Sequence, residues 1–218
     1  MEYTELFLIW RIFMTRKRNA KVQRDFPKRI YFVICEDEKS MLYYLRGLKE
    51  DLPPNVVLHA DHAQHTSIKK IQKEVKDKVK ELTRSQAYGN FKVFACFDKD
   101  NNNIQLIKSI ISDNQKSPLR GTIYNSPCYE YWLLLHTEKT NRDFSSSHEC
   151  AEYCRRKINK KYSETFEDID ELKKYEGIYN LVKSDLPKAI KNAEEYGFSE
   201  LENTCTNMHD FIKEIKVE

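Results

Sequence analysis

Two stretches decide the fold of this chain: Ile30-Tyr-Phe-Val-Ile-Cys-Glu36 and Phe91-Lys-Val-Phe-Ala-Cys-Phe-Asp98-Lys-Asp100. Each is an apolar run that ends in acidic residues, which is typical of a buried strand leading into a loop. The loops at the carboxyl ends of strands face the ligand crevice of an open α/β sheet, so Glu36, Asp98 and Asp100 can converge there. Such an all-oxygen site suits Mg²⁺, which drives phosphoryl transfer, and it indicates a nuclease-like centre.

The same acidic residues also have a plainer interpretation. Charged residues after a strand are often solvated turn residues, and Asp-Lys-Asp-Asn-Asn-Asn, over residues 98–103, is a good turn sequence in its own right. The two motifs together favour the metal site more than either motif does alone.

The rest of the first half alternates in pattern. Apolar runs predict strands over residues 31–35, 56–59 and 121–124 and a strand ending at Asp98, and helical spacing predicts helices over residues 38–50, 66–88 and 104–114. This β-α-β-α-β-α-β succession predicts an α/β fold with a mainly parallel sheet covered by helices on both faces. Residues 144–162, 169–181 and 186–196 are further helix candidates in a charged, helical C-terminal part.

Composition narrows the function. The chain has 218 residues, 33% charged and 40% hydrophobic, with a net charge of +3, so any phosphate-binding face must be local. No P-loop or dinucleotide-binding glycine motif is present, which excludes nucleotide hydrolysis by that route. The six cysteines lack a secretory context and indicate reduced thiols in a cytoplasmic protein.

The N-terminal region carries an apolar patch and a basic arm. The patch, residues 6–13, is far shorter than the ~20 residues of a membrane-spanning helix, so no membrane association is expected. The basic arm over residues 16–28 is either a solvated tail or a contact for a nucleic-acid backbone. The candidate nucleic-acid contacts are Arg16, Lys17 and Arg18 in this arm and Lys39 in the first acidic loop.

A third block, Asn125-Ser-Pro-Cys-Tyr-Glu-Tyr-Trp-Leu-Leu-Leu-His136, gives the sequence a recognisable signature. Together with Ile34-Cys-Glu-Asp-Glu-Lys-Ser, Phe97-Asp-Lys-Asp and the late Asn203-Thr-Cys-Thr-Asn-Met-His209, it resembles the RloB-like family. These are small bacterial proteins of antiviral defence, built on a Toprim-type core and often encoded with a partner ATPase. The resemblance runs from about Arg16 to the end of the chain.

The resemblance implies a Toprim site. Asp98 and Asp100 would bind a divalent metal, Mg²⁺ or Mn²⁺, and Glu36 would act as general acid or base or as a further ligand. Glu130 would ligate a second metal or orient the other carboxylates. The chain departs from the family pattern at Asp37, which stands where the family usually has Gly, and this puts the geometry of that turn in question.

Other residues have competing interpretations. Glu130 falls in the first turns of a predicted helix, where a carboxylate is electrostatically favoured, so it is either a structural charge or part of the site. His136, six residues on, need not share that site. His59, His62 and His65 lie in a predicted loop without a zinc-site spacing, which favours solvated histidines.

These observations predict three parts: an N-terminal segment and basic arm over residues 1–26, a Toprim-like core over residues 27–136 and a helical C-terminal part over residues 137–218. The expected function is a divalent-metal-dependent nuclease of the RloB type, acting on nucleic acid with an ATPase partner. The alternative is a catalytically inactive Toprim-like adaptor that binds a partner protein or nucleic acid. The sequence does not decide between DNA and RNA.

Overall fold

The computed structural model describes residues 28–85, 90–100, 102–196 and 203–216. The first half alternates strands and helices, as the apolar patterns predict. The elements are β1 (Arg29–Cys35), α2 (Ser40–Leu48) followed by a 3-10 turn (Lys49–Asp51), β2 (Val56–His62), α3 (Ile68–Ser85), β3 (Phe91–Asp98), α4 (Ile104–Gln115) and β4 (Arg120–Ser126).

The strands form one five-stranded sheet in the order β2-β1-β3-β4-β5. Strands β1 to β4 are parallel, and the short β5 (Cys205–Thr206) joins the end of β4 antiparallel. Parallel strands need long crossover connections, and α2, α3 and α4 provide them. The prediction of an α/β fold with a mainly parallel sheet is therefore confirmed.

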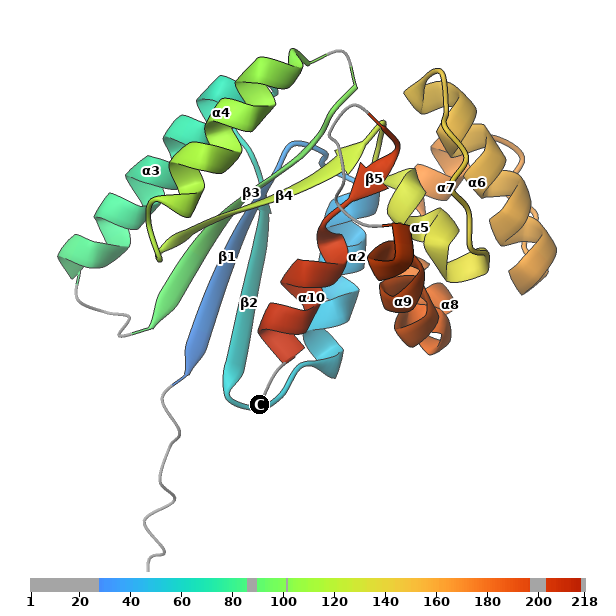
Figure 1. Cartoon of the computed structure of the whole chain (residues 1–218). Coiled ribbons are helices and arrows are strands. Elements are labelled where there is room, and N and C mark those ends of the chain that lie inside the picture. The colour runs from blue at the N-terminus through green and yellow to red at the C-terminus, as the bar shows by residue number, and fades with distance from the viewer. Residues whose placement is uncertain (1–27, 86–89, 101, 197–202, 217–218) are drawn as a thin grey trace, which may run out of the picture.

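Helices cover both faces of this sheet (Figure 1). Tyr31 and Val33 of β1 belong to the core cluster that contains α2 and α10 (Met208–Lys216), whereas Phe32 belongs to the cluster that contains α3 and α4. Successive strand residues point to opposite faces, so a strand buried on both sides reads as a continuous apolar run. This explains why β1 and β3 show no polar alternation.

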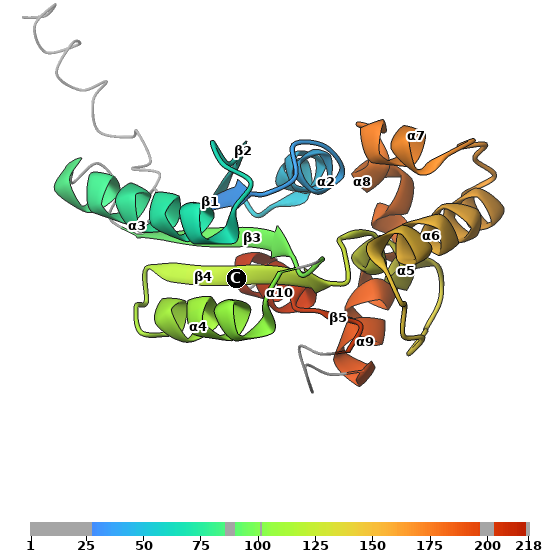
Figure 2. The ribbon, with the colours of Figure 1, turned by 90° about the horizontal axis from the view of Figure 1, so that it is seen from above.

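The helix α5 (Glu130–Thr137) is buried almost all round, and Trp132 and Leu133 have no exposed surface. A helix that is apolar on every side must be enclosed by other elements. Figure 2 shows α5 beyond the ends of β3 and β4, together with the C-terminal helices. These are α6 (Ser147–Tyr162), α7 (Ile169–Lys174), α8 (Ile178–Val182), a 3-10 turn (Lys183–Asp185) and α9 (Leu186–Tyr196).

The last carbonyl groups of α5 find side-chain donors on the surrounding helices. Lys161 Nζ donates to the carbonyl of His136, Lys188 Nζ to that of Thr137, and Asn192 Nδ2 to that of Leu135. Without such partners the end of a buried helix would leave its carbonyls unsatisfied. The C-terminal helices therefore hold α5 in place by hydrogen bonds as well as by apolar packing.

The C-terminal part differs from the prediction in two ways. The helix predicted over residues 169–181 is two short helices, α7 and α8. The chain then returns to the sheet as β5 and α10, where Asn207 Oδ1 accepts from the amide of Tyr124 and its Nδ2 donates to the carbonyl of Thr122. The end of the chain thus completes the edge of β4, and the division into parts at residue 136 stays a prediction.

The structure also bears on the histidines, the cysteines and the N-terminal region discussed above. Strand β2 runs to His62, three residues past its predicted end at His59, so the prediction of a loop at His62 is wrong. The last two residues of the strand, Asp61 and His62, are polar and exposed, so no apolar pattern marked them as strand. All six cysteines are free and buried. No helix in the described ranges is long and apolar enough to cross a membrane. Residues 1–26, with Arg16, Lys17 and Arg18, lie outside the described residues.

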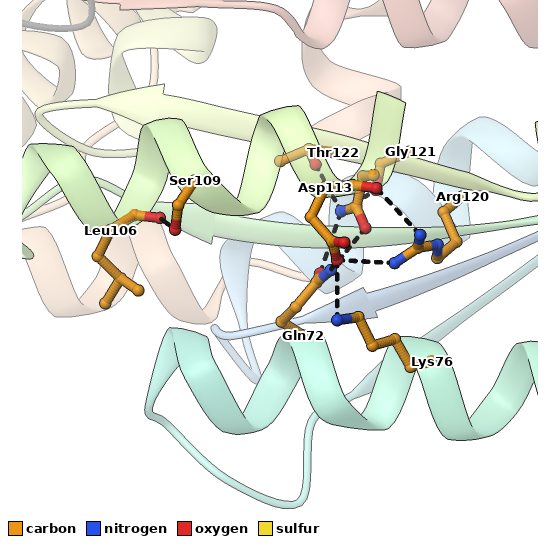
Figure 3. A network of polar contacts seen from close by, with 9 residues as sticks. Gln72, Lys76, Leu106, Ser109, Asp113, Arg120, Gly121 and Thr122 are labelled. Carbon is orange, nitrogen blue, oxygen red and sulfur yellow. Dashed lines mark hydrogen bonds and ion pairs between the residues drawn. The ribbon is translucent and has the colours of Figure 1, made fainter. Parts of the chain in front are cut away.

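A polar network ties α3, α4 and β4 together (Figure 3). Asp113 Oδ2 accepts hydrogen bonds from Gln72 Nε2 and Arg120 Nη1, both at 2.8 Å, and lies 2.9 Å from Lys76 Nζ. Next to it, Asn114 Nδ2 donates to Thr122 Oγ1 at 2.7 Å. The Asp113 carboxylate therefore has three donors, two of which are cationic.

Candidate functional site

The candidate site lies where the strand order reverses. From β1 the chain crosses to β2 on one side, and from β2 it crosses back to β3 on the other side of β1. In open α/β sheets, this reversal opens a crevice outside the carboxyl ends of the two central strands. Glu36 directly follows β1 and Asp98 is the last residue of β3, so both stand at the strand ends where such a crevice is expected.

Glu36 and Asp98 are in direct contact. Glu36 Oε2 accepts a hydrogen bond from the backbone amide of Asp98 at 3.2 Å, although the two residues are 62 positions apart. Asp98 pairs in register with Asn125 of β4, and Asn125 Nδ2 donates to Asp98 Oδ1 at 3.0 Å. The side chains at the ends of three neighbouring strands thus form one connected cluster, in which Glu36 and Asp98 are both half-buried.

The two carboxyl groups hold their protons more tightly than usual. Burial raises the pKa of Glu36 from 4.5 to about 7, and repulsion from Asp100 and Asp37 adds to it. Burial also raises the pKa of Asp98 well above its usual value, with further repulsion from Glu130 and Asp100, while the hydrogen bond from Asn125 acts in the opposite direction. The crevice therefore concentrates negative charge that a cation would relieve.

Asp100 is exposed and lies beside this pair in an unusual backbone conformation. Its φ is 37°, in the left-handed region, which Asp adopts more readily than most residues. Its amide donates to the carbonyl of Pro127 at 3.0 Å, and its carboxylate accepts a hydrogen bond from the hydroxyl of Ser147, the first residue of α6. The side chain of Asp100 is therefore turned toward the C-terminal helices.

Glu130, the first residue of α5, is only 2% exposed. Lys173 Nζ of α7 lies 3.8 Å from Glu130 Oε1, and the charge of Glu130 is the largest influence that raises the pKa of Lys173. Glu130 is also the first charge that raises the pKa of Asp98. Glu130 is thus close enough to act on Asp98 electrostatically, and its cationic partner comes from the C-terminal part.

Asp37 has a structural role that its position in the motif did not reveal. Its Oδ2 accepts from Ser40 Oγ at 3.0 Å and from the amide of Met41 at 3.2 Å, so it satisfies the start of α2. Asp100 and Ser163 are the non-glycine residues with positive φ in the described part of the chain, and Asp37 is not one of them. The turn after Glu36 therefore does not need a glycine here.

The carboxylates of Glu36 and Asp98 provide enough oxygen ligands for a Mg²⁺ ion whose remaining ligands are water and substrate phosphate. Within the described ranges, no group of three or more His, Cys, Asp or Glu side chains is arranged to hold a metal ion. Asp100 accepts from Ser147 and Glu130 lies near Lys173, whereas the Glu36 carboxylate is bound to the backbone amide of Asp98, beside the Asp98 side chain. One or two carboxylates with water and substrate phosphate suffice for Mg²⁺. The predicted set of four metal ligands stays a prediction.

The other predicted site residues lie as follows. Lys39 stands at the start of α2, three residues after Glu36, so it is near the crevice. His136 is fully buried, with Nδ1 against the carbonyl of Trp132 and Nε2 3.2 Å from Tyr44 Oη, and burial lowers its pKa to about 4. His136 is thus a core residue and not part of the site.

Sequence reasoning missed the residues that the C-terminal part brings to the crevice. Ser147 and Lys173, with Ala151 and Asp168, line a hollow of about 460 Å³ between α6 and α7. Thr206 of β5 contacts Asn125. The late block around Thr206 was visible in the sequence as a signature, but nothing in the charged helices marked Lys173 among its neighbouring lysines.

Comparison with known proteins places the chain in a family. A family model described as RloB-like protein matches residues 31–215. No curated protein and no solved structure matches the chain. The family match includes the strand ends that carry Glu36 and Asp98, the block from Asn125 to His136, and β5. Since it covers most of the sequence, the chain belongs to the RloB-like protein family.

Proposed function

We propose that this chain is a Mg²⁺- or Mn²⁺-dependent nuclease that cleaves phosphodiester bonds of nucleic acid. The observation that carries the proposal is the contact between Glu36 and Asp98 at the point where the strand order reverses. Both carboxyl groups have raised pKa values, and perturbed acids at a crevice are typical of catalytic sites.

Each residue has a role in the proposed reaction. Asp98 would hold the divalent ion, which would supply Lewis-acid polarisation of the phosphate and a more acidic bound water, and Glu36 would either ligate the ion as well or transfer a proton. The pKa of Glu36, about 7, suits a group that takes up and releases a proton near neutral pH. Lys173, beside Glu130, and Lys39 are cations available to a phosphate backbone near the crevice. The resemblance to Toprim-type nucleases supports the same assignment.

The biological setting is part of the proposal. RloB-like proteins are often encoded with a partner ATPase, so we propose that the chain acts with such a partner in cytoplasmic antiviral defence. The partner would supply the trigger, because nothing in the described residues binds a nucleotide through a glycine-rich loop.

A catalytically inactive adaptor is the second candidate. The observation that favours it is that no three potential metal-binding side chains are grouped in the described ranges. An adaptor would keep the fold and the family signature but would bind its partner or nucleic acid without cleaving it.

The experiment compares two aspartates. Purified protein, alone and with the ATPase encoded beside it, is incubated with labelled DNA and tRNA, with and without Mn²⁺. We expect metal-dependent cleavage that Asp98→Asn reduces at least ~100-fold, the equivalent of ~2.7 kcal/mol of transition-state stabilisation. Asp113→Asn, which removes a carboxylate from the network of α3 and α4, should keep most of the activity. Intact substrate under every condition, with the ATPase present, would support the adaptor instead.

A further inference from the structure

Strand β5 brings one hydroxyl to the buried side of the candidate site. Thr206 pairs with Asn125 across the antiparallel β4–β5 contact, and Thr206 Oγ1 donates to Asn125 Oδ1 at 2.7 Å. Asn125 has no exposed surface and Thr206 is 5% exposed. Buried amide groups need partners for both their oxygen and their nitrogen, and Thr206 supplies the partner of the oxygen.

The direction of these hydrogen bonds follows from the backbone. The amide of Met208 donates to Thr206 Oγ1 at 3.1 Å, and an amide N–H can only donate. The hydroxyl therefore accepts from Met208 and has its single hydrogen left for Asn125 Oδ1. This fixes the side-chain amide of Asn125 with its NH2 group toward Asp98, where Nδ2 donates to Oδ1 at 3.0 Å.

We propose that Thr206 is a positioning residue for the site: through Asn125 it fixes the orientation of the Asp98 carboxylate for ligand binding in the crevice. The proposal rests on the proposed function, in which Asp98 holds a divalent ion. Groups that orient a metal-binding carboxylate by hydrogen bonding typically change metal affinity by 10–100-fold when they are lost. It also gives the late family signature a role in the site, exerted through Asn125.

The test removes the hydroxyl of Thr206 in β5 and, as a control, the hydroxyl of Thr122 in the neighbouring strand β4. Thr206→Val keeps the shape of the side chain but leaves Asn125 Oδ1 without its donor, while Thr206→Ser keeps the hydroxyl. Thr122→Val is the matched control, because it removes a hydroxyl that accepts from Asn114 in the Asp113 network. Mn²⁺ affinity is measured by calorimetry, and the solvent exchange of the Asn125 side-chain NH2 protons is measured by NMR without metal.

We expect Thr206→Val to weaken Mn²⁺ binding ~10–100-fold and to speed the exchange of the Asn125 NH2 protons. Thr206→Ser and Thr122→Val should stay close to the wild-type values. Should valine prevent folding, Thr206→Ala removes the hydroxyl without added bulk. A folded Thr206→Val protein with wild-type Mn²⁺ affinity and unchanged exchange of the Asn125 NH2 protons would overturn the positioning role of Thr206 and leave the proposed function standing. A wild-type protein that binds no Mn²⁺ would overturn the proposed function, and the positioning role with it.

Discussion

Asp98, the last residue of β3, and Asp113, in helix α4, stand in opposite surroundings. Asp113, near the start of β4, accepts hydrogen bonds from Gln72 and Arg120 and pairs with Lys76, and these partners lower its pKa to about 2, with the bond from Lys76 the largest influence. Asp98, at the end of β3, faces Glu130 and Asp100, and its pKa is raised by burial and then by these two charges.

The two aspartates show two roles of a carboxylate in a folded protein, one structural and one suited to binding a cation. The charge of Asp113 is matched inside the protein, so ionisation of Asp113 favours the folded state and needs no ligand. The charge of Asp98 is opposed by its neighbours, so ionisation disfavours the folded state until a cation arrives. The raised pKa values of Glu36 and Asp98 therefore mark carboxylates whose charge is disfavoured, first by burial and then by repulsion, and a bound cation would relieve this cost.

The largest expected effect that tests this comparison is a pH dependence of stability without metal. Between pH 4.5 and about 7, folded Glu36 keeps a proton that the unfolded chain has released, so Glu36 lowers the free energy of unfolding as pH rises through this window. His136, whose pKa is lowered to about 4, contributes a slope of the opposite sign, so the Glu36 contribution is the difference between the wild type and Glu36→Gln. The expected loss is on the order of 3 kcal/mol, at 1.36 kcal/mol per pKa unit. Urea unfolding of the wild type and of Glu36→Gln at a series of pH values measures it, as the part of the pH dependence that the substitution removes.

The Asp113 network should respond in another window. Because the pKa of Asp113 is lowered from 3.8 to about 2, its contribution is present above pH 3.8 and is lost as pH falls toward 2. Asp113→Asn should therefore alter the acid limb and leave the slope between pH 4.5 and 7 intact. Equal slopes in that upper window for the wild type and for Glu36→Gln would contradict the raised pKa of Glu36.

The next effect in size is stabilisation by a divalent ion. On the proposed function, Mn²⁺ at a hundredfold excess over its Kd should stabilise the folded protein by ~2.7 kcal/mol. Thermal unfolding with MnCl2, against NaCl of matched ionic strength, measures the gain. Asp113→Asn should keep it and Asp98→Asn should lose it. An equal gain in both variants would place the bound ion elsewhere.

The smallest expected effect is the difference in stability between Asp113→Asn and Asp98→Asn in the absence of metal. Asp113→Asn removes the charge that pairs with Lys76 and Arg120, and since Asp113 is 34% exposed we expect a loss of only ~1 kcal/mol. Asp98→Asn keeps an acceptor for Asn125 but removes repulsion, so at pH 8 it should be neutral or stabilising. Unfolding midpoints at one pH decide this, and a clear destabilisation by Asp98→Asn would remove the contrast.

The strands and the central contact were within reach of sequence reasoning. The continuous apolar runs before Glu36 and Asp98 predicted strands buried on both faces, and the rule for parallel sheets predicted that their carboxyl ends meet at one edge. That rule does not depend on the details of packing, which is why two residues 62 positions apart could be expected to meet.

The rest of the site depends on packing that no local pattern encodes. Lys173 lies on a six-residue helix that carries two lysines, and only the docking of α7 decides which one approaches Glu130. Strand β5 has two residues, too few to show a period of two, and its place is set by the Asn207 side chain as much as by its backbone. The role of Asp37 was hidden because its capping contacts involve residues three and four positions on.

The pairing of β4 with β5 also sets an order of assembly during synthesis. Asn125 leaves the ribosome 81 residues before Thr206, an interval of roughly 4–16 s at ~5–20 residues per second. Throughout that interval the nascent chain carries Asp98 and Asn125 without the hydroxyl that orients Asn125. On the two proposals, the site therefore lacks its positioning residue until β5 has been synthesised.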